Sequence, residues 1–528
     1  MKQNLLVKII VGIAVFALLI VLLIKVIAEP RIEKQIQAAL TEKSGDFLIT
    51  IEKVQVSILH SEVELGNITL KSKSENEEQP GLSGEIESVR FKGIHMLKVL
   101  FRKELDISTI EIYNSRLTGE IPFQEKTRPA VVAPLTIRIK SLLFNRLFID
   151  LKDAASSQTY LVSEGVLKMS DIRFQKKDTL SPGIIGQFDF DMPEFKTVTS
   201  DSLYTFKAEG ISYSANSNML TANNFAIQPN YSEYAFAARN QFETDRFEGR
   251  FSQLSFHDFS AEALIKAGNL TSSLIEIGEI ELNIFRDKRK EFRHVDKPTF
   301  QDFIYNYPGN LNIDSIRILS GNIVVSQHAE EAAEKGSIRF SKIDATISKI
   351  SNDTIYKTEK GYLELNATGL LMDKGRLTVL LKARIFDRNG TFTVSGALSG
   401  MEASALNPML EKTAFITINS GTINDLNFSF SANNTKATGT LIVLYQGLNV
   451  AVINKKTGES SGIMAWVKSV VANIIMIESN PMPGEDVRPG VIEYERDPER
   501  FLFNYIVKAL LSGINTSITK ETKPNKSK

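Results

Sequence analysis

The chain has 528 residues, and its 62 Lys and Arg balance its 62 Asp and Glu, so the formal net charge is zero. A hydrophobic share of 43% and a charged share of 23% exclude a disordered, collagen-like or polytopic membrane protein. The zero net charge argues against nucleic-acid binding, and the absence of Cys excludes disulfides, thiolate metal sites and a cysteine nucleophile.

The chain begins with an apolar stretch from Leu5 to Ile27 that is long enough to cross a hydrocarbon core of ~30 Å. A cleaved signal peptide is the alternative, but the stretch is longer than the usual apolar region of such peptides, and Lys25 interrupts the approach to a cleavage site at Ala28. We therefore expect residues 1–28 to be a membrane anchor. The 3 and 4 spacing of apolar residues that follows predicts an amphipathic helix over 29–45.

From residue 46 to residue 445, apolar and polar residues alternate with a period of two, and Gly66-Asn67 is a turn-prone pair in this region. Because no regular helical crossover interrupts the strands, the pattern predicts a mostly β fold: an elongated, curved antiparallel sheet. We interpret 446–515 as a closing segment with helices and 516–528 as a disordered tail.

A diffuse repeat runs through the predicted strands. Its three copies start at Ile107, Ile139 and Ile313, and each places apolar residues at offsets 0, 3 and 5. Side chains two residues apart share one face of a strand. The apolar face therefore carries the last two positions of each copy, which are Ile110, Ile112, Leu142, Phe144, Ile316 and Ile318. Glu111 and Arg317 are expected on the opposite face.

Helical patterns return at three places: 260–265, 465–477 and 500–511, with Gly513 at the position of a helix C-cap. The dense charge cluster at 286–293 is interpreted as a solvated loop in preference to a contact with anionic headgroups, because its charges have mixed signs.

Sequence motifs for chemistry are absent. The five His residues are scattered without metal-ligand spacing, and the chain contains no phosphate-binding glycine loop, no GxSxG elbow and no HExxH. We therefore expect no catalytic residue, no metal and no cofactor.

Several segments of the chain are similar to one family. They are the N-terminal stretch, the opening strands that end in LGNITLKS, the middle section around 284–343, and the closing motifs Leu406-Asn-Pro408, Gly439–Leu448, Ser479-Asn-Pro481 and Tyr494-Glu-Arg-Asp497. Together they resemble AsmA-like bacterial envelope proteins, the group that includes AsmA and TamB. Val325-Ser-Gln-His328 departs from the pattern after the third repeat.

The resemblance implies a single-pass inner-membrane protein with most of its chain in the periplasm, which supports envelope homeostasis by binding or conducting lipid between the inner and outer membranes. The expected ligand is a phospholipid or another lipid with acyl chains, and outer-membrane or other envelope proteins are further partners that the resemblance implies. The resemblance also implies that the sheet curls into a groove, and the six apolar residues of the repeat would then line this lipid groove.

Two other classes of function stay open at this point. A scaffold that regulates outer-membrane protein assembly without conducting lipid needs only a closed apolar core. An envelope hydrolase or glycan enzyme needs a pair of carboxylates across a cleft, which sequence alone neither shows nor excludes.

Overall fold

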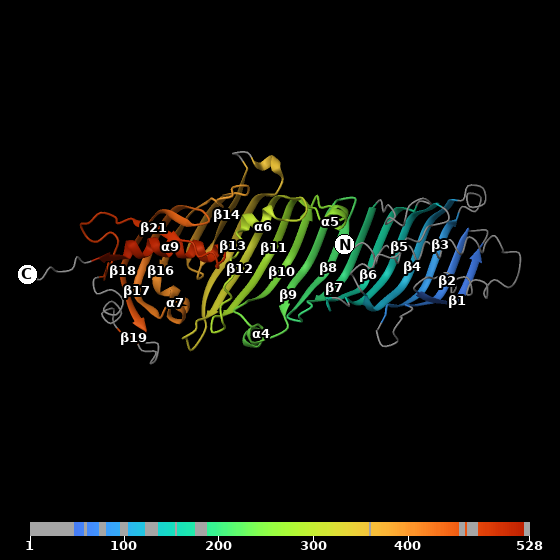
Figure 1. The fold of residues 1–528 in the computed structure, drawn as a ribbon, viewed down its shortest axis with the longest axis horizontal. Coiled ribbons are helices and arrows are strands. Elements are labelled where there is room, and N and C mark those ends of the chain that lie inside the picture. The colour runs from blue at the N-terminus through green and yellow to red at the C-terminus, as the bar shows by residue number, and fades with distance from the viewer. Residues whose placement is uncertain are drawn as a thin grey trace, which may run out of the picture. The chain divides into compact units, whose positions relative to one another are not determined.

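The computed structural model describes residues 47–57, 61–72, 81–94, 104–121, 136–153, 156–174, 187–357, 361–453, 460–461 and 474–521. This part of the chain is mostly β, as the sequence predicts, and its strands form a curved sheet that does not close on itself (Figure 1). The expected anchor over 1–28, the amphipathic helix over 29–45, and both His60 and His95 lie outside the described residues.

The chain divides into two compact units. The first unit comprises Met1–Ala226 with Ser260–Lys266, and the second comprises Ile227–Phe259 with Ala267–Lys528.

The described strands of the first unit follow one another in the sheet in chain order. They are β1 (Phe47–Ser57), β2 (Glu62–Ser72), β3 (Ser83–Ile94), β4 (Glu104–Ile121), β5 (Thr136–Asp153), β6 (Thr159–Phe174), β7 (Gln187–Val198), β8 (Tyr204–Ser214) and β9 (Met219–Pro229), which passes the boundary between the units. The short helix α5 (Ala261–Ala267) confirms the helix predicted at 260–265, and its Ser260 hydroxyl accepts a hydrogen bond from the Ala263 N–H at 3.1 Å.

The second unit contains the other described strands and the remaining helices. Its strands are β10 (Asp245–His257), β11 (Leu270–Asp287), β12 (Leu311–His328), β13 (Gly336–Ser351), β14 (Tyr362–Leu371), β15 (Gly375–Arg384), β16 (Phe392–Glu402), β17 (Ile416–Ala432), β18 (Lys436–Ile453), β19 (Ser460–Ser461), β20 (Ile474–Met476), β21 (Gly490–Glu495) and β22 (Thr519–Glu521). Its helices are α4 (Glu233–Arg239), α6 (Phe300–Tyr305), α7 (Asn407–Thr413), α9 (Leu502–Ile518) and the two 3₁₀ turns η1 (Thr354–Lys357) and η2 (Ala403–Leu406).

Two strand pairs differ from the antiparallel arrangement that the sequence predicts. β4 pairs with β5 in parallel, and β11 pairs with β12 in parallel, whereas the other strand pairs with a described register are antiparallel. Two parallel neighbours run in the same direction, so the chain must return to the end at which the first strand began before the second strand starts. In the second unit this crossover is 288–310, which includes α6.

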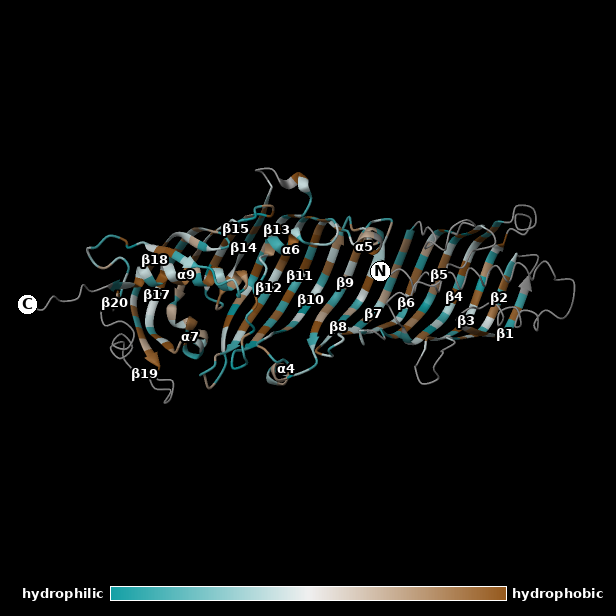
Figure 2. Cartoon of the chain, in the orientation of Figure 1, coloured by the Kyte–Doolittle hydropathy of each residue, from teal (hydrophilic) through white to brown (hydrophobic). Residues whose placement is uncertain are grey.

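The repeated offset of three residues in the sequence has a structural reason. In both parallel pairs, one residue on each strand is left unpaired at two levels of the register. These residues are Ser108 and Lys140, then Asn114 and Arg146, in the first unit, and Ser273 and Asp314, then Gly278 and Leu319, in the second. Because this extra residue bulges out, as in a β-bulge, two residues that are three apart in sequence point to the same face of the strand. The apolar face is therefore continuous along each strand, and Figure 2 shows the alternation of hydrophobic and hydrophilic residues.

The pair Gly66-Asn67 corrects another expectation, because it lies inside β2 and not at a turn. Asn67 has left-handed backbone with φ of 52°, and its side chain donates to Glu52 on the neighbouring strand at 2.9 Å. Asn tolerates this conformation better than most residues. The Gly-Asn pair, which is typical of a turn, marks a bulge within a strand here.

The C-terminal helix confirms one prediction and corrects another. α9 covers most of the predicted 500–511 segment but continues to Ile518, past the C-cap expected at Gly513. Gly513 is buried inside the helix, where a Cβ atom would lie 2.6 Å from both Ile492 Cγ1 and Leu441 Cδ2. This glycine serves the close approach of α9 to the sheet. Of the helix predicted at 465–477, residues 465–473 lie outside the described residues and 474–476 form β20.

Candidate functional site

The strand register shows which of the six expected groove residues lie together. Ile110 is opposite Leu142 and Ile112 is opposite Phe144 across the parallel pair β4–β5. Ile316 and Ile318 lie in the second unit, opposite Ile275 and Ile277 on β11. The first four residues therefore form one cluster, and the last two belong to another.

In the first unit these residues belong to two apolar rows that run across the strands. Directly opposite residues on neighbouring strands share a face of the sheet. Row A contains Val63, Phe91, Ile110, Leu142, Met169 and Phe188, from β2 to β7. Row B contains Val54, Leu65, Val89, Ile112, Phe144, Leu167, Phe190 and Tyr213, from β1 to β8. No charged residue interrupts either row.

The first-unit rows are deeply buried at their centre. Ile110, Ile112 and Leu142 have exposed fractions of 0%, and Phe144 has 6%. Leu167, Phe188 and Phe190 on β6 and β7 are half-buried, whereas Met169 and Tyr213 in the same rows are buried. Within the described part of the chain, the buried residues of this core come from β1–β6 and from Leu82, and no helix contributes to it.

The second unit repeats this arrangement over more strands. Row C contains Phe256, Ile275, Ile316, Ile347, Leu365, Leu381, Val394, Phe430, Gly439 and Ile492. Row D contains Leu254, Ile277, Ile318, Ala345, Ala367, Val379, Gly396, Phe428, Leu441 and Gly490. Both rows extend from β10 to β21 without a polar residue. The glycines leave room for aromatic rings, since a Cβ atom on Gly396 would lie 2.6 Å from the ring of Phe428.

Burial along these two rows changes from one end to the other. Ile316 and Ile318 are half-buried, as are most row residues on β10–β15. Towards β21 the row residues are almost fully buried: Val394 and Ile492 each have an exposed fraction of 1%. Tyr505, Ala509 and other apolar residues of α9 belong to this closed core, and Figure 1 shows the helix lying along that end of the second unit. The helix of the chain itself therefore occupies one end of the second-unit rows.

The opposite face of the strands is polar, as the sequence predicts for Glu111 and Arg317. The Lys92 amine donates to the Glu111 carboxylate at 2.8 Å and the Tyr113 hydroxyl donates to it at 3.0 Å, while Arg317 is exposed. Burial acts to raise the pKa of Glu111, but these hydrogen bonds outweigh it and hold the pKa below its usual value. The two faces of the sheet thus differ sharply in polarity.

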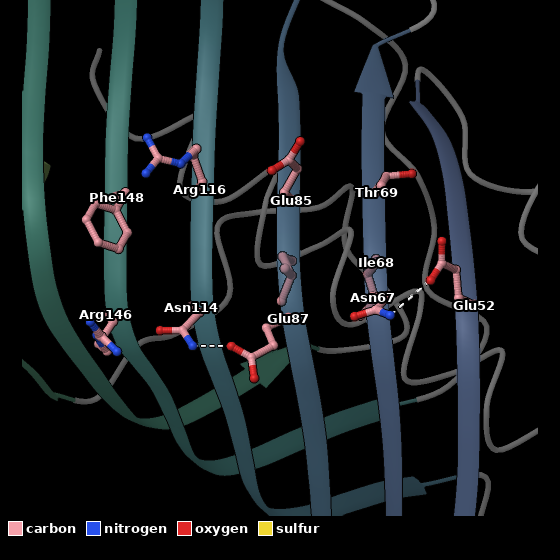
Figure 3. A pocket seen from close by; sticks show the side chains of 11 residues that line it. Glu52, Asn67, Ile68, Thr69, Glu85, Glu87, Asn114, Arg116, Arg146 and Phe148 are labelled. Carbon is pink, nitrogen blue, oxygen red and sulfur yellow. Dashed lines mark hydrogen bonds between the residues drawn. The ribbon is translucent and has the colours of Figure 1, made fainter.

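A shallow depression of about 510 Å³ lies on this polar face of the first unit (Figure 3). It follows a line of bulged residues, and Asn114 and Arg146 have φ of 46° and 57°. Asn114 donates to Glu87, and Arg146 donates to Glu164 at 3.0 Å. Since Glu87 and Arg146 have hydrogen-bond partners within the sheet, we assign the depression to bulge geometry and not to ligand binding.

Among the described residues, no group of His, Asp and Glu is arranged to hold a metal ion. His328 is buried, and its ring is fixed between the Tyr234 hydroxyl at 2.9 Å and the Ala332 carbonyl oxygen at 2.9 Å. His294 lies elsewhere, 3.0 Å from Glu499. These contacts give the two imidazoles structural roles.

The charge cluster at 286–293 is only in part the solvated loop that the sequence predicts: Arg286 and Asp287 belong to β11, whereas Arg289, Glu291 and Arg293 follow the strand and are exposed. Arg286 is paired with Asp245 at 2.7 Å, and Asp287 is buried and paired with Arg289 at 2.8 Å. The Arg293 guanidinium lies 5.9 Å from the centroid of the Phe242 ring. The mixed signs reflect pairing with other strands and rings, which sequence spacing does not reveal.

Sequence reasoning missed a fourth copy of the repeat. Ser272, Ile275 and Ile277 of β11 lie opposite Ile313, Ile316 and Ile318, at the same offsets of 0, 3 and 5. The first position of this copy is a buried Ser, which donates to the His257 carbonyl oxygen at 2.7 Å. A pattern that accepted Ser at offset 0 would have found it.

No protein-family model matches the chain, and no curated protein matches it. Within the part of the chain that the structure describes, no helix is long and apolar enough to span a membrane. The functional argument therefore depends on the rows themselves.

Proposed function

We propose that the protein binds lipid acyl chains along the apolar rows, and that it carries phospholipid between the inner and outer membranes as an envelope protein of the AsmA-like type. The observation that supports the proposal most directly is the register: four rows cross six to ten strands each without a charged residue. A water-soluble sheet has little reason to keep such rows unless something apolar covers them.

The length of the rows suits acyl chains. At ~4.8 Å between strands, the eight strands of row B span about 34 Å and the ten strands of row C about 43 Å. One acyl chain spans about half of a ~30 Å hydrocarbon core, so a row is longer than one chain. Each CH₂ transferred from water onto the row contributes about 0.8 kcal/mol.

The transport part of the proposal depends on the sequence. The apolar stretch from Leu5 to Ile27 would hold the protein in the inner membrane, and the family resemblance supplies the periplasmic location and the role in lipid traffic. The lack of recognisable catalytic motifs is compatible with a carrier, which needs no reacting group.

Photo-crosslinking tests the proposal. The purified full-length chain in detergent is incubated with a phospholipid that has a diazirine in one acyl chain, and after illumination the labelled peptides are identified by mass spectrometry. We expect labels on row residues of the half-buried stretches, such as Phe190 and Ile318. Labels confined to the polar face, or no label, would contradict lipid binding along the rows.

A matched pair of variants sharpens this test. Ile318→Asp places a charge on row D, whereas Arg317→Asp places the same residue on the polar face of the same strand. We expect Ile318→Asp to lower labelling on β11 and β12 and Arg317→Asp to leave it unchanged.

The burial of rows A and B favours a second candidate, a scaffold that regulates outer-membrane protein assembly without conducting lipid. Ile110, Ile112 and Leu142 are fully buried, as they would be in a closed core. Mass spectrometry of lipids retained by the purified chain separates the two functions, because the scaffold requires none.

A further inference from the structure

β1 forms an open edge of the sheet in the first unit (Figure 1). β2 pairs with it, and among the described residues no backbone hydrogen bond from any other element reaches 47–57. β21 has no such open edge, because hydroxyls of α9 accept hydrogen bonds from its N–H groups. In an antiparallel strand, half of the N–H and C=O groups point away from a single neighbour, so β1 presents a row of groups that can pair with a further strand.

A bulge in β1 restricts which strand can be added to it. Ile51 and Lys53 have partners on β2, but Glu52 between them has none in the register. Ile51 and Val54 both belong to the apolar face, whereas Glu52 and Lys53 are both exposed. An added strand without a bulge would match this apolar face on one side of Glu52 and turn its polar face to it on the other. The added strand must therefore bulge where β1 does.

The residue pattern of β1 is the same in both directions from this bulge. On either side of the central pair Glu52 and Lys53 comes one apolar residue, and then one exposed polar residue, Thr50 or Gln55. An antiparallel copy of β1 centred there places apolar residues opposite apolar residues and Glu52 opposite the partner's Lys53. The two bulges then lie at one level, as they do between β1 and β2.

The two central charges are available for such a contact. Glu52 accepts a hydrogen bond from the Asn67 amide at 2.9 Å, and neither Glu52 nor Lys53 forms an ion pair with a described residue. A lysine on an edge strand normally opposes pairing, because the incoming strand has no anion for it. A second copy of β1 supplies this anion in both directions. The edge therefore favours its own sequence over an unrelated strand.

We propose that β1 is the docking edge for a second copy of this chain, which adds its own β1 in the antiparallel direction with Glu52 opposite the partner's Lys53. Val54 of row B then lies opposite the partner's Ile51, so the apolar face continues from one chain into the other. The inference goes beyond the proposed function, and its test needs no lipid.

Charge reversal on the full-length chain in detergent tests the pairing. We expect the protein mass of wild type, measured by light scattering over a series of concentrations, to double as the concentration rises. Glu52→Lys and Lys53→Glu should each keep the mass of one chain, because each places like charges opposite one another. An equimolar mixture of the two variants should regain the doubled mass, because each chain supplies the charge that the other lacks.

Lys71→Glu is the matched control. Lys71 is exposed on β2, which has β1 on one side and β3 on the other, so the same change of charge lies away from the open edge. We expect this variant to double its mass as wild type does. Circular dichroism should be the same for all of these variants, because each replaces an exposed side chain.

Cross-linking tests the register. The chain has no Cys, so an introduced Cys is the sole thiol of each variant. In the proposed pair Thr50 is opposite the partner's Gln55, with ~5 Å between Cβ atoms, whereas the two copies of Thr50 lie five residues apart along the strands, about 17 Å. A short bismaleimide should therefore join chains in a mixture of Thr50→Cys and Gln55→Cys, and should join neither variant to itself.

Three results would overturn the inference. The first is a wild type that keeps the mass of one chain at every concentration. The second is a doubled mass in both charge variants, which would place the contact elsewhere, such as in the apolar stretch from Leu5 to Ile27. The third is a failure of the two variants to associate on mixing. None of these results bears on lipid binding along the rows, which photo-crosslinking of wild type tests separately.

Discussion

Ile112 and Ile318 occupy the same position of the repeated strand pattern but have different surroundings. Ile112 is fully buried in the first unit, whereas Ile318 is half-buried in the second. The alternation of residues determines which face a side chain occupies, but the curvature of the sheet and the elements packed on it determine its exposure. The same substitution should therefore have different effects at the two positions.

Replacement by Asp measures this difference. We expect Ile112→Asp to lower the free energy of unfolding by several kcal/mol, on the order of the cost of burying an unpaired charge, and Ile318→Asp to lower it much less, because water can reach its carboxylate. Denaturant unfolding followed by circular dichroism checks the prediction. Ile112→Val, which should cost only about 0.5–1.5 kcal/mol, separates the effect of charge from that of lost volume. Equal losses for the two Asp variants would contradict it.

Two phenols of the second unit give its stability a dependence on pH. Burial raises the pKa of Tyr445 and of Tyr505 to about 12. The Tyr445 hydroxyl donates to the Ile477 carbonyl oxygen at 3.0 Å, and the Tyr505 hydroxyl donates to the Asn433 carbonyl oxygen at 3.2 Å. Both groups are neutral in the folded state up to a higher pH than in the unfolded chain.

The sign follows from linkage. Because the folded pKa is raised, the stabilisation from each phenol is complete below the unfolded value near 10 and is lost as the pH rises through about 12. We expect the free energy of unfolding of the full chain to fall across this window. Tyr505→Phe should flatten the fall, and unfolding curves at several pH values between 9 and 12 measure it. An identical pH dependence in wild type and variant would contradict the assignment to Tyr505.

At the scale of elements, α9 both closes the core and terminates the sheet. Its Ser512 hydroxyl accepts from the Glu493 N–H at 3.2 Å, and its Thr516 hydroxyl accepts from the Val491 N–H at 2.8 Å. These two bonds satisfy donors on the outer edge of β21, where an unpaired strand edge would otherwise invite another strand. Gly513, between the two hydroxyl residues, allows the helix to approach this closely.

Enlarging Gly513 should separate α9 from the sheet. In Gly513→Val the new side chain would overlap Leu441 and Ile492, and overpacking of this kind typically costs about 1–3 kcal/mol. Asn515→Val is the control. Asn515 is exposed on the same helix, so this change tests only the lower helix propensity of Val. Thermal unfolding of both variants provides the comparison. A midpoint for Gly513→Val equal to that of Asn515→Val would show that the close approach has no energetic weight.

The sequence predicts which segments form strands better than it predicts which strands pair and in which direction. Period-two alternation predicts the β fold, and the residues at offsets 3 and 5 do lie in register across parallel strands. The step from offset 0 to offset 3 signals a bulge, but a single sequence does not show that neighbouring strands bulge at the same level. The parallel pairs also could not be predicted, because they depend on the path of crossovers such as 288–310, whose composition is that of a loop.

The same limit applies to the candidate sites. The apolar faces follow from alternation, whereas the ion pair of Arg500 with Glu243 at 3.5 Å joins residues that are distant in sequence and that only the fold brings together. Local spacing at 286–293 shows mixed signs and suggests a solvated loop. Only the fold shows which of these charges have partners.

At the scale of the whole molecule, the apolar rows occur twice, once in each unit. Rows A and B lie within the first unit and rows C and D within the second, and each set is built around one parallel strand pair. Each unit therefore has the features that the proposed function requires, a polar face and an unbroken apolar face. If both sets bind acyl chains, lipid content should depend on each unit separately.

Single and double variants test this independence. Phe190→Asp in row B and Ile318→Asp in row D both place a charge at a half-buried position, where the fold should tolerate it. We expect each to lower the amount of lipid retained by the purified full-length chain, and the double variant to lose the sum of the two losses, since distant sites without shared partners act additively. Mass spectrometry of extracted lipid measures the amounts. If one variant alone removes all retained lipid, only one unit binds it in the purified chain, and the repeated rows of the other unit serve as core.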